Sequence, residues 1–274
     1  MGSSSSKDSA DKVIILEDDK DNDFCASLRA NMTRCMLYAS SSDTKEQAYV
    51  AERLANEAVN RDRQAQIVEC GGIKLLVPLM KSSNSEVQRL ATHTLANLSA
   101  LPSNQRAIAE TPECLEVLFV LLHSEVPEVQ RQGAKTVANV SVVPDFMKSI
   151  AARGGLPPLI ALLSSPHPRT RVEAIAAVAN LAVDSENEKT FVDLGVFTPL
   201  LATLGGNGTK VPGDDDTAIQ VARALRNLTA RPENAKRLLE LNGRASVNAL
   251  AASSDARISQ QAAIALENLN KIKG

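Results

Sequence analysis

Apolar residues recur at helical spacing through most of this 274-residue chain. The segment that contains Leu75, Leu76 and Leu79 shows the spacing of three and four residues that places apolar side chains on one helix face. No segment alternates apolar and polar residues for long enough to predict a strand. The pattern therefore predicts an all-α protein.

Polar residues that favour helix N-caps precede several of these apolar segments. Asp43, followed by Glu46, has the spacing of a capping box. Either Asn84 or Ser85 can cap the helix that runs to Leu98. The prolines that we place in first helical turns, where a missing N–H costs little, are Pro78, Pro158 and Pro199.

A short motif returns at a nearly constant interval along the chain. It consists of a small or aliphatic residue, then asparagine, then in most copies leucine or valine, and its copies are 41, 42, 41, 47 and 41 residues apart. A helical period of about 41 residues is typical of units that bury their apolar faces against neighbouring units. The motif copies contain Asn56, Asn97, Asn139, Asn180, Asn227 and Asn268.

Glycines mark a second point in most units. Gly72 and Gly155 each lie 25 residues before the asparagine of their unit, and Gly195 and Gly243 also precede helical segments. The longest interval contains GGNGTKVPGDDD, residues 205–216, whose glycines, proline and acids predict a surface loop. This loop is either disordered or a partner contact.

The period, the glycine turn and the Asn-Leu ending together resemble the armadillo repeat. The resemblance covers about residues 43–272 in roughly six units, and it implies a right-handed superhelical solenoid whose third helices line a concave groove. We divide the chain into an N-terminal segment, residues 1–42, and an armadillo-repeat domain, residues 43–274. Within the first segment, Asp23 to Ala39 predict one helix that caps the apolar end of the stack.

Composition narrows the range of functions. Aromatic residues make up 3% of the chain and tryptophan is absent, which excludes sites that stack bases or sugars on aromatic rings. The net charge is -2, so no nucleic-acid partner is predicted. The resemblance adds that importin-type armadillo proteins hold tryptophan four residues before each groove asparagine, so a carrier of basic nuclear-localisation signals is not expected. Four widely spaced cysteines predict buried thiols.

The resemblance places one asparagine of each unit in the groove. A side-chain amide both donates and accepts hydrogen bonds, so it can pair with an extended peptide backbone. Alternatively, these asparagines tie helix ends to loops within the solenoid. The predicted rungs are Asn97, Asn139, Asn180 and Asn227.

Basic residues lie one and two turns before several of these asparagines, on the same helix face. The cations and the histidine at these positions are Arg89, His93, Arg131, Lys135 and Arg223. A groove of this sign suits an acidic partner segment. The alternative is that they are ordinary solvated side chains.

No catalytic motif or metal-ligating cluster is present in the sequence. The three histidines, His93, His123 and His167, lie in different units, and no nucleophile elbow, P-loop or HExxH pattern occurs. We therefore predict a protein that is not an enzyme and has no cofactor.

The first residues point to a membrane. Gly2 with Ser6 fits the N-myristoylation pattern, and the apolar run of residues 13–16 is too short to span a bilayer. A chain made almost entirely of armadillo units with such a start resembles the armadillo-repeats-only family of apicomplexan parasites. That resemblance implies a lipoprotein adaptor, carrying myristate and palmitate, on the cytosolic face of the rhoptry. The cysteines that carry palmitate in that family are absent here, where Ser5 and Ser6 stand.

Two functions follow as hypotheses. The first is a non-enzymatic adaptor that anchors and positions the rhoptry by linking its membrane to a motor myosin and an adenylate cyclase through the groove. The second is a soluble, cytosolic peptide-binding scaffold, similar to catenins or transport carriers, with no membrane role.

Overall fold

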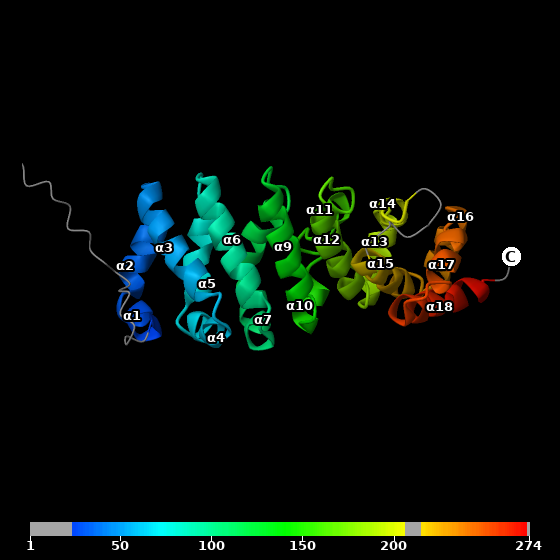
Figure 1. The fold of residues 1–274 in the computed structure, drawn as a ribbon, viewed down its shortest axis with the longest axis horizontal. Helices are drawn as coiled ribbons and strands as arrows, with labels where there is room; N and C mark the ends of the chain where they lie inside the picture. Colours follow the sequence, from blue (N-terminus) through cyan, green and yellow to red (C-terminus); the bar gives the residue numbers. More distant parts are fainter. Residues whose placement is uncertain (1–23, 206–214, 273–274) are drawn as a thin grey trace, which may run out of the picture.

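The computed structural model describes residues 24–205 and 215–272, and this part of the chain contains eighteen α-helices and no strand. Gly2, residues 13–23 and most of the loop at 205–216 lie outside the described residues. The helices form successive layers along one long axis (Figure 1). The predicted all-α class is confirmed.

The helices follow one another as six consecutive triplets. The first three triplets are α1 (Phe24–Ala30), α2 (Met32–Ala39) and α3 (Thr44–Glu57); α4 (Arg61–Glu69), α5 (Gly72–Met80) and α6 (Ser85–Ser99); and α7 (Pro102–Ala109), α8 (Pro112–Leu121) and α9 (Pro127–Val140). The last three are α10 (Pro144–Ser149), α11 (Leu156–Leu162) and α12 (Pro168–Leu181); α13 (Ser185–Asp193), α14 (Phe197–Ala202) and α15 (Asp215–Leu228); and α16 (Pro232–Glu240), α17 (Arg244–Ala251) and α18 (Ala256–Asn270).

The third helix of each triplet packs against the third helix of the next. Contacts run from α3 to α6, α9, α12, α15 and finally α18. One continuous apolar core, from Phe24 to Leu269, joins all the layers, because no triplet can bury its own apolar face alone. The four cysteines are buried in this core, as predicted, and none of them forms a disulfide. Among the described helices, none has both the length and the apolar character needed to cross a bilayer.

Residues 24–39 form two helices where the sequence predicted one. The break is at Asn31, whose Nδ2 donates to the carbonyl oxygen of Ser27 at 3.0 Å. Asparagine favours helix interruption because its side chain competes for backbone groups in this way. Leu28 and Cys35 are fully buried, and α2 packs against α3 and α5, so both helices belong to the first layer of the stack. The predicted domain boundary falls between α2 and α3 and stays a prediction.

Both predicted N-caps are present. The Asp43 side chain accepts a hydrogen bond from the Lys45 N–H, and Asn84, rather than Ser85, caps α6. The placement of Pro78 in a first turn is wrong, because it is the seventh of nine residues in α5. There Pro78 has no N–H to donate to the carbonyl of Lys74, so α5 lacks one intrahelical hydrogen bond.

In four triplets a two-residue turn joins the first helix to the second. At Gly154 the backbone has φ 74°, a left-handed conformation that favours glycine. The next N–H, of Gly155, donates to the Ile150 carbonyl at 3.0 Å, and a Cβ on Gly155 would lie 2.9 Å from the Phe119 ring. The other pairs at these two positions are Gly71 and Gly72, Gly195 and Val196, and Asn242 and Gly243.

Candidate functional site

The C-terminal halves of four third helices, α6, α9, α12 and α15, are almost enclosed, and each leaves one narrow accessible face. Between Ala91 and Ser99 of α6, only His93 and Asn97 are accessible to solvent. The same spacing recurs on the next third helices, because the preceding helix, the following helix and the apolar core cover all the remaining faces. The accessible residues of the corresponding segments are Lys135 and Asn139 of α9, Ala176 and Asn180 of α12, and Arg223, Arg226 and Asn227 of α15. These accessible residues lie at equivalent positions on successive third helices that pack against one another.

The asparagine amides connect successive third helices. Asn139 Nδ2 donates to Ser99 Oγ at 3.0 Å, from α9 to the end of α6. Asn180 Nδ2 donates to the Ala138 carbonyl at 2.9 Å, and Asn227 Nδ2 to the Ala179 carbonyl at 2.7 Å. The alternative of a structural role is thus correct in part, although the amides tie helix to helix rather than helix to loop.

These bonds use only part of each amide. One Nδ2 proton and the Oδ1 acceptor of Asn139 and Asn227 have no hydrogen-bond partner among the described residues. Asn180 differs, because its Oδ1 accepts from Arg223 Nη2 at 2.7 Å. Arg223 is therefore held by the ladder, and peptide binding by the four asparagines stays a prediction.

Asn180→Ala is expected to lower the free energy of unfolding by about 2 kcal/mol, since it removes hydrogen bonds to two other helices at about 1 kcal/mol each. Asn97→Ala is the matched control, because the Asn97 amide makes no hydrogen bond within residues 24–205 and 215–272, and a smaller loss is expected. Urea denaturation followed by circular dichroism measures both. Equal losses would contradict a structural ladder centred on Asn180.

Two of the predicted groove cations already have partners. Arg89 forms a two-point ion pair with Glu86, at 2.6 and 2.8 Å, and Arg131 forms one with Glu128, at 2.6 and 3.0 Å. The sequence interpretation missed these two acids. Their spacing of three residues along a helix was a readable signal, since side chains at i and i+3 are neighbours.

Adjacent third helices also interact through charge. Burial raises the pKa of Glu173 on α12, while Lys135 and Arg131 of α9 act in the opposite direction. Burial, followed by the nearby Arg89, lowers the pKa of His93, so its imidazole is neutral at pH 7. No group of histidine, cysteine, aspartate or glutamate in the described residues is arranged to hold a metal ion.

Stacked helical triplets with one accessible stripe along their third helices define an α-helical repeat solenoid. Two segments, residues 60–100 and 152–183, match the family described as the armadillo/beta-catenin-like repeat. The first segment contains α4 to α6 and the second contains α11 and α12. These two segments are therefore similar to armadillo repeats, and the eighteen described helices have the architecture of an armadillo-type solenoid.

Solved structures agree with this assignment. The crystal structure of an engineered protein is 31% identical, with a TM-score of 0.75 over 86% of this chain and 95% of that one. A designed armadillo repeat protein in complex with the peptide (KR)4 is 21% identical, with a TM-score of 0.73 over 86% of this chain and 98% of that one.

A structure from a study of a phosphorylation switch between cadherin and beta-catenin is 18% identical. Its TM-score is 0.75 over 86% of this chain and 44% of that one. No curated protein sequence matches the chain. The two structures below 25% identity support the fold alone.

Proposed function

We propose that this protein is a non-enzymatic scaffold that holds an extended, acidic segment of a partner protein along its third helices. The observation that supports the proposal is the accessible stripe, formed by equivalent positions of the successive packed helices α6, α9, α12 and α15. Amide groups with unused donors and acceptors recur along it, and they suit the backbone of an extended chain. The armadillo family provides a general precedent, since one designed member was solved with a bound peptide.

The sign of the charge selects the partner. On α9, α12 and α15, accessible cations outnumber accessible acids. The cations are Arg131, Lys135, Arg169, Arg171, Arg223 and Arg226, and the acids whose side chains are described are Glu128, Glu173 and Asp216. An acidic segment therefore gains favourable electrostatic energy, whereas a basic peptide such as (KR)4 would be repelled.

A direct test uses two fluorescent probe peptides, an eight-residue peptide of alternating Asp and Glu and the basic peptide (KR)4. The full chain is expected to bind the acidic peptide with an affinity that falls as salt is added, and not to bind (KR)4. Fluorescence anisotropy measures both. Binding of (KR)4 alone would overturn the acidic-segment proposal.

We extend the proposal to an adaptor on the cytosolic face of the rhoptry membrane, with a motor myosin and an adenylate cyclase as partners. This part rests on the resemblance to the armadillo-repeats-only family and on the pattern at Gly2 and Ser6, which lies outside the described residues. A single myristoyl chain binds membranes only weakly, so a second contact is required for stable attachment. The alternative remains a soluble, cytosolic scaffold.

Gly2→Ala separates the two versions. Purified N-myristoyltransferase with an alkyne analogue of myristoyl-CoA is expected to label the chain but not this variant, because the acyl group is attached to the glycine amine. In parasites, the variant is expected to move from the organelle fraction to the cytosol. Ser9→Ala, outside the pattern, is the control. An unlabelled wild-type chain would favour the cytosolic scaffold.

A further inference from the structure

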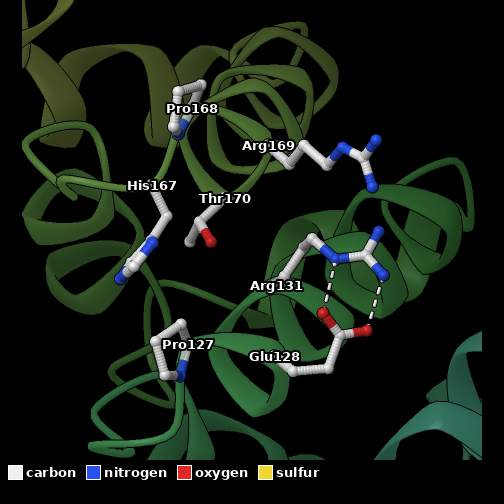
Figure 2. Close-up of a pocket in the computed structure, with 7 residues that line it drawn as sticks. All are labelled: Pro127, Glu128, Arg131, His167, Pro168, Arg169 and Thr170. Carbon is white, nitrogen blue, oxygen red and sulfur yellow. Dashed lines mark hydrogen bonds and ion pairs between the residues drawn. The ribbon is translucent and has the colours of Figure 1, made fainter.

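A pocket of about 400 Å³ lies between the first turns of α9 and α12 (Figure 2). Its walls come from two successive third helices, and Arg131 and Glu128 belong both to the pocket and to the accessible stripe. The pocket therefore adjoins the surface on which we place the partner segment. The residues that line it are Pro127, Glu128, Arg131, His167, Pro168, Arg169 and Thr170.

Thr170 lines the pocket with a hydroxyl for which no hydrogen-bond partner is seen among the described residues. Its side chain is 99% buried, since only 1% of the residue is exposed, and Figure 2 shows the hydroxyl directed toward the middle of the pocket. Other buried threonines of the third helices, such as Thr136 and Thr229, donate to the carbonyl four residues earlier. Thr170 lies in the first turn, so its own helix offers no such carbonyl, and no acceptor for it exists among the described residues.

The backbone at the same point also has free donors. The N-cap residue of α12 is His167, whose side chain makes no capping bond, whereas Asn84 caps α6 with bonds from two N–H groups. The N–H groups of Arg169 and Thr170 have no acceptor within the described part of the chain. Free N–H groups at the start of a fourteen-residue helix favour an anion.

Two guanidinium groups flank this end of the pocket. Figure 2 shows Arg169 and Arg131 on the same side of the pocket. Glu128 points its carboxylate toward Arg131 and away from Thr170, and it also accepts from Gln132 Nε2 at 2.7 Å. The Glu128 carboxylate is therefore already bound by Arg131 and Gln132. Arg169 and the Thr170 hydroxyl remain available to a ligand.

We propose that this pocket binds the anionic end of one partner side chain, a carboxylate or a phosphomonoester. The Thr170 hydroxyl and the first N–H groups of α12 would donate to its oxygens, while Arg169 balances its charge. The apolar surfaces of Pro127 and Pro168 would contact the stem of the side chain. This inference rests on the proposed function for the origin of the side chain, but the pocket can be tested without any partner segment.

The experiment titrates the full chain with three small probes: N-acetyl-phosphoserine amide, N-acetyl-glutamate amide and inorganic phosphate. Amide NMR signals of Arg169 and Thr170 are followed. The proposal expects saturable shifts with at least one of the two capped amino acids, and the stronger of the two identifies the anionic group. Shifts with inorganic phosphate alone, or with none of the probes, would overturn the proposal while leaving the acidic-peptide test unaffected.

Thr170→Val removes the hydroxyl and keeps the shape of the side chain. Because that hydroxyl has no partner, this variant should be at least as stable as the wild type while binding the probe about tenfold more weakly. Arg169→Gln should also weaken binding. Thr190→Val and Arg153→Gln, outside the pocket, are the matched controls. Unchanged binding in both pocket variants, or equal loss in the controls, would contradict the assignment.

Discussion

Gly72→Ala is expected to lower the free energy of unfolding by about 3 kcal/mol. A Cβ at this position would lie 2.7 Å from the carbonyl oxygen of Ile67 and would also overlap the Ile67 side chain. The carbonyl belongs to the backbone of α4, so it cannot move aside without shifting the helix. The loss should appear as a lower urea midpoint in circular dichroism.

Gly154→Ala is the matched control for this prediction. Gly154 has a left-handed backbone, with φ 74°, but a Cβ there would meet no atom within 4 Å. The cost should therefore be backbone strain alone, about 1 kcal/mol. A loss at Gly154 equal to that at Gly72 would show that turn conformation, rather than close packing, decides the stability of these units.

Arg131→Gln with Lys135→Gln is expected to weaken binding of the acidic probe peptide about tenfold and to reduce its salt dependence. Neutral replacements are chosen because Glu128 and Glu173 lie beside these cations, as their effects on pKa show. Replacement of Arg131 and Lys135 by glutamate would place four carboxylates close together, with Glu128 and Glu173, and their repulsion would destabilise the fold. Fluorescence anisotropy at two salt concentrations measures the change.

The control for this double variant is Lys148→Gln with Arg153→Gln. It changes the net charge by the same amount, but both residues lie in or after α10, away from the stripe on the third helices. It should bind the acidic peptide as the wild type does. Equal weakening in both double variants would indicate a non-specific effect of net charge and would contradict binding in the groove.

Much of the candidate site could be predicted because its spacing is local. The side chains at Asn139 and Lys135 share a helix face by geometry alone, and the structure leaves only these two accessible between Gln132 and Val140. The ion pair from Arg131 to Glu128 was equally local, and it was missed because only the cations were followed along the helix. The single helix predicted across Asn31 was wrong because a propensity that favours a break was given too little weight.

The sequence by itself determined the helical class and the repeat, because hydrophobic period, capping residues and turn glycines all act within a few residues of one another. Only the tertiary structure decided which polar groups form hydrogen bonds and which remain without a partner. Asn139 and Ser99 are 40 residues apart and meet only when two layers stack, and Thr170 comes to line a pocket only when α9 packs beside α12. A hydrogen bond or an unpartnered hydroxyl depends on which atoms surround it in space, and the order of residues along the chain does not contain that information.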